Sequence, residues 1–313
     1  MIDAQSLSMH FGQVTALHDA TFHVGQGEIL GLLGPNGAGK STIMKILTTY
    51  LRPSQGTAMV CGLDILKNPR KVREKIGYLP EHLPLYLNME VGEYLTFVAQ
   101  ARGLSQSKVR ERLDWVLTKT DLLPMFYRPI AQLSKGYRQR TALAQALIHD
   151  PEVIILDEPT TGLDPHQVLE IRNLIQELSQ SKTILFSTHI LHEVEAIAHR
   201  VVIISQGTIK AQGTVAELAM QANVRPWITM EIQKSSAEVL QALQQLSGVD
   251  QAYVIVEDGP WATIRIAALA PVSTLEQIFA LCQAQNWPLR KLNLENPSLE
   301  KIFLALTRLD QAA

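Results

Sequence analysis

Short apolar runs recur along the first two-thirds of the chain, and most of them are followed by a segment with helical periodicity. They include residues 28–34 (EILGLLG), 153–156 (VIIL), 184–186 (ILF) and 200–207 (RVVIISQG). A continuous apolar run of strand length, bounded by glycine or charge, is typical of a strand buried on both faces of a parallel sheet. The alternation of such strands with helices predicts an α/β domain.

One of these runs leads into a glycine-rich turn and then into a helix. Residues 27–47 read GEILGLLGPNGAGKSTIMKIL, with the spacing G-x-x-x-x-G-K-[ST] at Gly34, Gly39, Lys40 and Ser41. Such a turn aims its N–H groups and the helix N-terminus at one anion. We expect Lys40 to reach the β- and γ-phosphates of a nucleotide and the Ser41 hydroxyl to ligate Mg²⁺. A plain surface turn is the alternative, which the complete pattern between strand and helix disfavours.

Two carboxylates end the run at 153–156, within the segment PEVIILDEPTTGLDP at 151–165. In a parallel sheet, ligands gather at the carboxyl ends of the strands, so Asp157 and Glu158 should face the same crevice as the phosphate loop. We expect Asp157 to hold Mg²⁺, directly or through water, and Glu158 to be the base that polarises the attacking water. A pair of acids on a solvated surface is the alternative, and the phosphate loop weakens it.

The run at 184–186 ends in Ser187, Thr188 and His189, and another helix follows. A lone histidine is more often structural than catalytic, but this one lies at the carboxyl end of a strand in a nucleotide fold. We expect His189 to contact the γ-phosphate and to hold the water and Glu158 in place.

A second polar, glycine-containing segment, LSKGYRQR at 133–140, stands at the start of a helix far from the first loop. Taken alone, it is best explained as a polar helix cap with Ser134 at the N-cap position. The same geometry also suits a phosphate contact.

Composition narrows the class of protein. The 313 residues suffice for about two domains, and 46% apolar with 19% charged residues is typical of a globular chain. The net charge of −2 gives no reason to expect binding to nucleic acid. Cys61 and Cys282 are far apart, which favours reduced thiols over a disulfide framework.

The sequence also bears on location. Its first residues show no basic region followed by an apolar run, so we expect the chain to begin in the cytoplasm. It contains no stretch of about 18 consecutive apolar residues, so a partner chain would have to supply any membrane span.

Five segments have the order and spacing of one family. They are a Walker A motif GPNGAGKST (34–42), a signature LSKGYRQR (133–140), a Walker B motif with its glutamate VIILDEP (153–159), a D-loop GLDP (162–165) and an H-loop STH (187–189). On these residues, the chain over 1–220 resembles the ATP-binding subunit of an ABC transporter. The resemblance implies a P-loop NTPase core with a helical subdomain at about 86–150, and hydrolysis of ATP to ADP and phosphate with Mg²⁺.

The resemblance also implies that two copies pack head to tail, each phosphate loop facing the other copy's signature. Two ATP molecules would lie between them. The catalytic residues would then be Glu158, His189 and Lys40. The ligands of Mg²⁺ would be Ser41, Asp157 and Glu81. The nucleotide would be bound by Phe11 (stacked on adenine), Gly34, Pro35, Asn36, Gly37, Ala38, Gly39, Lys40, Ser41, Thr42, Glu81, Ser134, Lys135, Gly136 and Asp164.

One position departs from the family pattern. Within IGYLPEHLPLY at 76–86, Glu81 stands where most relatives have glutamine. A carboxylate there adds charge beside the triphosphate, so Glu81 either ligates Mg²⁺ or turns away. The glutamate form resembles a branch that includes gliding-motility and related ABC-2-type exporters, and we hypothesise that Glu81 couples hydrolysis to the membrane partner.

The pattern changes near residues 221–226 and predicts a second domain over 225–313. Strand, helix, hairpin, helix, strand and helix are expected in turn, with a capped helix at 235–246 and a hairpin that turns at Asp258 and Gly259. The order β-α-β-β-α-β resembles a ferredoxin-like α+β unit. We interpret it as regulatory or dimer-stabilising, with a small-ligand sensor as the alternative.

The leading interpretation is a homodimeric ATPase subunit that drives export through a separate, multi-spanning transmembrane permease. It would sit peripherally on the cytoplasmic face of the inner (plasma) membrane. The segment PSLEKIFLAL at 297–306 resembles the tail of export-type subunits and favours export over import. The alternative is a soluble ABC ATPase that remodels ribosomes or nucleic acid, but such proteins usually carry two ATPase cores, a coiled coil or basic extensions. A P-loop kinase is disfavoured by the signature and by Glu158, and the transported substrate is not specified by this chain.

Overall fold

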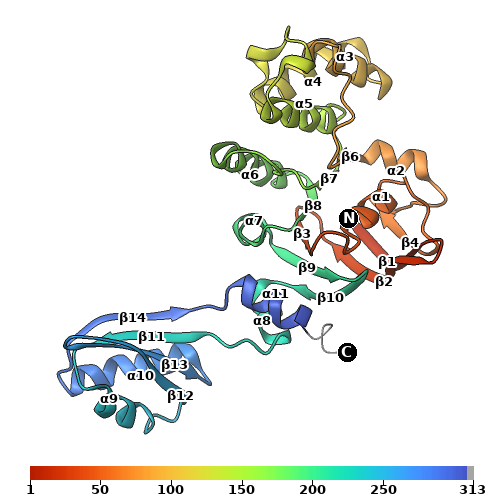
Figure 1. Cartoon of the computed structure of the whole chain (residues 1–313). Coiled ribbons are helices and arrows are strands. Elements are labelled where there is room, and N and C mark those ends of the chain that lie inside the picture. The colour runs from red at the N-terminus through yellow and green to blue at the C-terminus, as the bar shows by residue number, and fades with distance from the viewer. Residues whose placement is uncertain (309–313) are drawn as a thin grey trace. The chain divides into compact units, whose positions relative to one another are not determined.

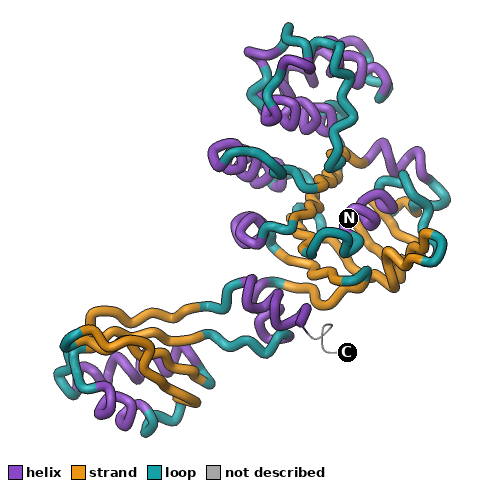
Figure 2. The backbone as a smooth tube through the Cα atoms, viewed as in Figure 1, coloured by secondary structure: helices purple, strands orange, loops and turns teal. Residues whose placement is uncertain are grey.

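The computed structural model describes residues 1–308, and the chain folds as two compact units that divide between Val215 and Ala216 (Figures 1 and 2). The last five residues of the predicted second domain, 309–313, lie outside the described residues. Within the described part, no helix combines the length and the apolar character needed to cross a bilayer.

A six-stranded sheet forms the centre of the first unit, in the order β10-β9-β3-β8-β7-β6. Neighbouring strands are parallel except β10 and β9. The strands are β3 (Ile29–Leu33), β6 (Ile76–Leu79), β7 (Val153–Asp157), β8 (Thr183–Thr188), β9 (Arg200–Ser205) and β10 (Thr208–Gly213). Every residue of β3, β7 and β8 is buried, which confirms the prediction from their apolar runs.

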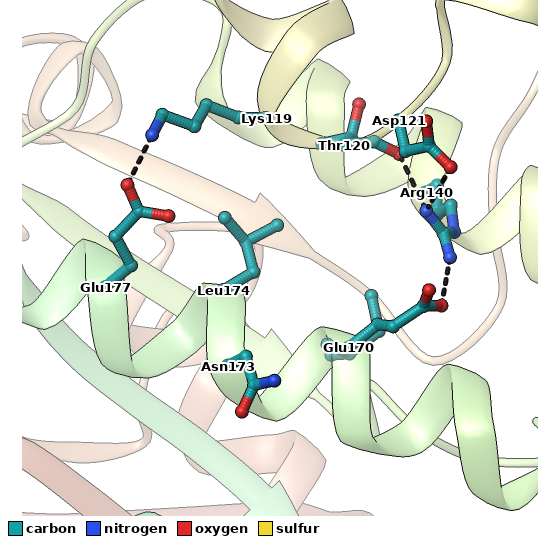
Figure 3. Close-up of a pocket in the computed structure, with 9 residues that line it drawn as sticks. Lys119, Thr120, Asp121, Arg140, Glu170, Asn173, Leu174 and Glu177 are labelled. Atoms are coloured by element: carbon teal, nitrogen blue, oxygen red, sulfur yellow. Dashed lines mark hydrogen bonds and ion pairs between the residues drawn. The ribbon is translucent and has the colours of Figure 1, made fainter.

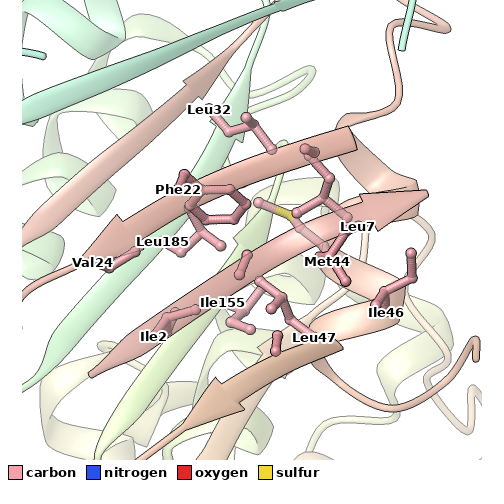
Figure 4. Packing of buried hydrophobic residues seen from close by; sticks show 14 of the residues in the cluster. Ile2, Leu7, Phe22, Val24, Leu32, Met44, Ile46, Leu47, Ile155 and Leu185 are labelled. Atoms are coloured by element: carbon pink, nitrogen blue, oxygen red, sulfur yellow. The ribbon is translucent and has the colours of Figure 1, made fainter. Parts of the chain in front are cut away.

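A second sheet, antiparallel and in the order β2-β1-β4-β5, completes the first unit's β-structure. Its strands are β1 (Ile2–Phe11), β2 (Val14–Val24), β4 (Gln55–Val60) and β5 (Leu63–Asp64). Helix α1 (Lys40–Leu47) shares one apolar core with both sheets, in which Met44 packs with Phe22 and Leu185 (Figure 4). Each large side chain buried there contributes about 1.5–3 kcal/mol to the free energy of folding, so a stable core supports the helix that follows the phosphate loop.

Helices account for the rest of the first unit. They are α2 (Pro69–Lys75), α3 (Val91–Ala101), α4 (Gln106–Lys119), α5 (Lys135–Leu147), α6 (Pro165–Ser179) and α7 (Leu191–Ile197), with 3₁₀ turns η1 (Leu123–Met125) and η2 (Ile130–Gln132). The segment predicted to be helical contains α3, α4 and α5 between β6 and β7. The chain therefore leaves the sheet after β6 and returns to it at β7, where the two acids stand.

The second unit contains a four-stranded antiparallel sheet in the order β12-β13-β11-β14. Its elements are β11 (Trp227–Ile232), α9 (Ser236–Leu243), β12 (Val249–Asp258), β13 (Trp261–Ala268), α10 (Pro271–Ala284), β14 (Leu289–Glu295) and α11 (Leu299–Arg308); α8 (Val215–Gln221) lies at the division between the units. Ile264, Ile266 and Ile278 belong to its separate apolar core.

Two details of this unit correct the sequence analysis. Asp258 pairs with Trp261, so the two-residue loop of the hairpin is Gly259 and Pro260, one position later than predicted. Gly259 supplies the left-handed φ of +56° that the turn needs, and the fixed φ of proline suits the next position. Helix α9 begins after Ser235, but the side chain of Ser235 makes no capping hydrogen bond.

Candidate active site

The phosphate loop, residues 34–39, connects the buried strand β3 to the N-terminus of α1. Gly39 has a φ of +108°, and a Cβ there would lie 2.8 Å from the carbonyl oxygen of Ala16. A Cβ on Gly34 would lie 2.3 Å from the carbonyl oxygen of Ile204. Glycine is therefore required at both ends of the loop by close backbone contact, and at Gly39 by its dihedral angle as well.

Lys40, the first residue of α1, is buried and folds back over the loop. Its Nζ donates to the carbonyl oxygens of Gly34 at 2.7 Å and Pro35 at 3.3 Å. The same Nζ lies 3.5 Å from Oε1 of Glu158. The loop thus brings a cation, and α1 brings a helix N-terminus, to the point where the acids of β7 end, which is an arrangement suited to a phosphate group.

The two acids at the end of β7 are held by one hydroxyl from β8. Asp157 and Ser187 are partners in the β7–β8 register, and Oγ of Ser187 donates to Oδ1 of Asp157 at 2.6 Å. The backbone N–H of Glu158 donates to the same Oγ at 2.9 Å. Glu158 has a φ of +50°, which costs a non-glycine residue about 1–3 kcal/mol and persists only where the surroundings enforce it.

Both carboxylate oxygens of Glu158 have partners in the site. Oε1 faces Lys40, whereas Oε2 lies 2.9 Å from Nδ1 of His189 and accepts a hydrogen bond from Oγ1 of Thr161 at 3.2 Å. The glutamate is 7% exposed, and the histidine is much more open to solvent. A buried carboxylate with an imidazole in contact can orient a water molecule and accept its proton. The structure brings Lys40, Asp157, Glu158 and His189 together.

Two side chains of the site have oxygen atoms that suit a hard cation. They are the carboxylate of Asp157 at the end of β7 and the hydroxyl of Ser41 on the first turn of α1, and such oxygens are the ligands that Mg²⁺ prefers. Among residues 1–308, no group of three or more His, Cys, Asp or Glu side chains is placed to hold a metal ion. This small donor set fits Mg²⁺, which is commonly bound by one or two carboxylates together with phosphate oxygens and water.

The signature segment opens α5. Ser134 is its N-cap, and Oγ accepts a hydrogen bond from the N–H of Tyr137 at 3.4 Å. Gln139 donates from Nε2 to the carbonyl oxygen of Pro159 at 2.8 Å, which ties α5 to the loop after Glu158. Among the described residues, no hydrogen bond or ion pair joins residues 133–136 to the phosphate loop. A helix N-terminus is suited to an anion, and the N-terminus of α5 is not hydrogen-bonded to this chain's own phosphate loop in the described part of the chain.

Ion pairs join the helical subdomain to α6 around a small pocket (Figure 3). Arg140 of α5 bonds to Glu170 of α6 and lies 3.3 Å from Asp121. Lys119 at the end of α4 bonds to Glu177, two turns further along α6. Solvent-accessible ion pairs contribute about 0.2–1 kcal/mol each to stability. These pairs therefore favour one orientation of the helical subdomain against α6 but hold it only weakly.

The remaining predicted residues lie around this centre. Phe11 ends β1 with 47% of its surface exposed, and Glu81 follows β6 and is exposed. Burial, and then the charges of Asp157 and Glu81, raise the pKa of Tyr78 on β6. Asp164 is the N-cap of α6 and accepts from the N–H of Gln167 at 3.0 Å.

Two signature residues pack within their own chain. The side chain of Lys135 reaches over Gly162 in the D-loop, where an added Cβ would lie 1.9 Å from Nζ. A Cβ on Gly136 would lie 2.4 Å from Oε1 of Gln167. The signature segment is therefore packed against the D-loop and the first turn of α6 of the same chain.

The hydrogen bonds that hold the segments of the candidate site were not predicted from the sequence. Four side chains make hydrogen bonds to the segments of the candidate site, and nothing in the local pattern distinguishes them from ordinary strand, turn and helix residues. They are Ser187, Thr161, Gln139 and Glu193. Of these four residues, only Ser187 has a signal that could have identified it, because the parallel register of β7 and β8 sets it beside Asp157.

Comparisons with known proteins agree with this geometry. The family model for "ABC transporter" matches residues 17–161. The uncharacterized ABC transporter ATP-binding protein YxlF of Bacillus subtilis (strain 168) is 32% identical over 308 residues, 97% of this chain and 98% of that protein. Nod factor export ATP-binding protein I of Paraburkholderia xenovorans (strain LB400) is 36% identical over 222 residues, 69% of this chain and 72% of that protein. A solved structure, "Structure of ATP binding subunit of ABC transporter", is 32% identical with a TM-score of 0.67 and covers 72% of this chain and 94% of its own.

Proposed function

Because the chain belongs to the ABC transporter family, as an ATP-binding subunit, we propose that it hydrolyses ATP between two copies of itself and so drives export through a separate transmembrane permease. The observation that carries this proposal is the position of Glu158, held between Lys40 and His189 at the end of β7. A carboxylate with one oxygen toward the phosphate-loop cation and the other on an imidazole is suited to act as the base that activates the water for attack on the γ-phosphate, which supports this proposal.

The second copy supplies what one chain lacks. The free anion-binding end of α5, with Ser134 at its N-cap, supports binding of the γ-phosphate of the neighbour's ATP. Two copies related head to tail then enclose two nucleotides, each between the Lys40 loop of one and the Ser134 segment of the other. ATP closes the dimer because it completes contacts that neither copy makes alone, and hydrolysis reopens it.

Magnesium is the second cofactor of the proposed reaction. Asp157 and the Ser41 hydroxyl would hold it, with phosphate oxygens and water as its other ligands. When bound, the ion neutralises charge on the β- and γ-phosphates. Ser187 contributes by orienting the carboxylate of Asp157, and Lys40 by contacting the phosphates once they displace its present carbonyl partners.

Export, rather than import, is supported by the name of the Nod factor export protein among the relatives and by the tail at 297–306. The partner would be a multi-spanning permease, with this subunit peripheral on the cytoplasmic face of the inner membrane. Since YxlF is similar over nearly the whole chain, the second unit belongs to the same type of subunit. We assign the domain over 225–313 a regulatory or dimer-stabilising role.

Cell fractionation tests this function. The chain should sediment with membranes, should be released by detergent together with a multi-spanning protein, and should lose that association when the permease gene is deleted. Its ATPase activity in the detergent extract should require Mg²⁺ and fall to background in EDTA. Co-sedimentation with ribosomes in place of membranes would contradict the proposal and favour a soluble remodelling ATPase.

We propose that Glu81 couples ATP hydrolysis at the site to the permease. It is exposed just after β6, and its charge reaches Tyr78 on that strand. Glu81→Ala should therefore lower permease-stimulated hydrolysis and transport by about tenfold, which corresponds to a loss of about 1.4 kcal/mol of transition-state stabilisation. The measurement compares basal and stimulated ATPase in reconstituted vesicles, with the nearby Glu74→Ala as the control. An unchanged stimulated rate would contradict this role.

A further inference from the structure

A buried glutamate on α7 has no part in the reaction as described so far. Glu193 is 3% exposed, and it takes part in none of the ion pairs among the described residues. Its Oε1 accepts a hydrogen bond from Oγ1 of Thr160, and its Oε2 accepts one from Oγ1 of Thr188 at 2.7 Å. Both threonines are themselves buried, at 5% and 0% exposed.

The two threonines belong to the two segments that carry the catalytic pair. Thr160 is two residues after Glu158, in the loop that follows β7, and Thr188 directly precedes His189 at the end of β8. The two segments are distant in sequence, and Glu193 contacts both from a third element. Its carboxylate is therefore a cross-link between the loop of the base and the loop of the histidine.

The hydroxyl of Thr188 has a partner for both of its hydrogen-bonding roles. Its Oγ1 donates to Glu193 and accepts from the N–H of Ile190 at 3.0 Å. The backbone on either side is also tied, since the N–H of Thr161 donates to the carbonyl oxygen of Glu158 at 3.2 Å. The hydroxyls of Thr160 and Thr188 are thus both part of short turns that are themselves closed by hydrogen bonds.

Energetics argue against a role in packing alone. A buried carboxylate without a cation loses its hydration, and two hydroxyl donors restore only part of what water supplied. An unbranched apolar side chain of similar length fills the same volume without that loss. What the carboxylate adds is two directed bonds at a fixed separation, and these set the spacing of Thr160 and Thr188.

We propose that Glu193 is a positioning residue that keeps His189 in contact with Glu158. It acts through the two threonines and does not touch the nucleotide. The inference rests on the catalytic roles proposed for Glu158 and His189, whose Oε2 and Nδ1 are 2.9 Å apart. Loss of the cross-link lets the two segments separate, and a displacement of about 1 Å in such a pair lowers the rate by about 10²-fold.

Two substitutions at Glu193 separate geometry from charge. Glu193→Met keeps the volume and removes both acceptors, so it should lower kcat by about 10- to 100-fold with the KM for ATP unchanged. Glu193→Gln loses the charge but still accepts one hydroxyl and donates to the other, so it should stay within about threefold of the unchanged protein. Steady-state hydrolysis over a range of ATP concentrations, with direct binding of a fluorescent ATP analogue, provides both constants.

The His189 ring provides a second readout that a purely structural role would not change. In ¹⁵N-histidine-labelled protein, the Nδ1 signal of His189, assigned by its loss in His189→Gln, reports the bond to Glu158. That signal should shift in Glu193→Met toward its position in Glu158→Ala, which lacks the acceptor, and stay in place in Glu193→Gln. If Glu193→Met does not fold, Thr160→Val removes one arm of the cross-link and should show the same selective fall in kcat.

Three results would overturn the proposal: full kcat in Glu193→Met or, where that variant does not fold, in Thr160→Val; equal loss in the Met and Gln variants, which would assign the effect to charge; or an unmoved His189 signal. The parallel Glu158→Gln measurement separates this inference from the proposed function. Normal hydrolysis in Glu158→Gln would refute the catalytic assignment itself, whereas a stalled Glu158→Gln beside a fully active Glu193→Met would refute only the cross-link.

Discussion

Replacement of Glu158 by glutamine should reduce ATP hydrolysis by about 10²- to 10⁴-fold, the contribution of a general base, while ATP binding stays close to that of the unchanged protein. Glutamine keeps the shape of the side chain and a carbonyl oxygen that can still accept from His189. It cannot accept a proton from water, and it no longer supplies a charge to Lys40, which lies 3.5 Å away. The loss should therefore fall on kcat.

The measurement is phosphate release at saturating Mg·ATP, with the affinity for a fluorescent ATP analogue determined on the same preparation. Glu238→Gln is the matched control, because Glu238 forms an ion pair with Lys234 on the surface of the second unit, outside the candidate site. That control should hydrolyse ATP at the normal rate. A Glu158→Gln protein with normal hydrolysis would show that another group is the base.

Much of the site follows from the sequence because its parts are local. The loop from Gly34 to Lys40 and the acids after Leu156 are each set by a few adjacent residues and by the strand that precedes them. The parallel register then brings the ends of β3, β7 and β8 to one edge. The family resemblance added which distant segments belong to the same reaction.

What the sequence does not show are contacts that depend on how segments distant in sequence are packed. In the sequence, Ser187 is a polar residue near the end of an apolar strand. Only its place beside Asp157 in the sheet lets it hydrogen-bond to both acids. Glu193 reads as one of several charges on a short helix, although it is buried between two threonines. Side-chain burial at a given position is decided by the neighbouring segments, which local periodicity does not reveal.

The predicted position of the hairpin loop in the second unit was wrong for a different reason. Asp-Gly is the usual signal for a two-residue hairpin loop, and that preference suggested a turn at 258 and 259. The following proline also favours a turn, and it places Gly259 at the first loop position instead. Two local signals competed, and the pairing of Asp258 with Trp261 across the sheet decided between them.

A carboxylate at position 134 should prevent ATP from joining two copies. Ser134→Asp preserves the helix end, because aspartate is as good an N-cap as serine and its charge suits a helix N-terminus. It removes a hydroxyl and repels the neighbour's triphosphate at both sites of the dimer. Losing about 1.5 kcal/mol at each site weakens the dimer by about 100-fold.

Ser134→Asn is the matched control, since asparagine caps a helix equally well and carries no charge. It should retain ATP-dependent pairing, whereas Ser134→Asp should not, although both bind nucleotide through the intact Lys40 loop. If the two variants paired equally well, Ser134 would not face a nucleotide.

The mass of the stalled Glu158→Gln protein in solution tests most directly the claim that ATP is held between two copies of this chain. By light scattering, it should be a monomer without nucleotide and a dimer at saturating Mg·ATP, and Ser134→Asp in the same background should stay monomeric. A stalled protein that binds Mg·ATP fully and yet remains monomeric would contradict the account.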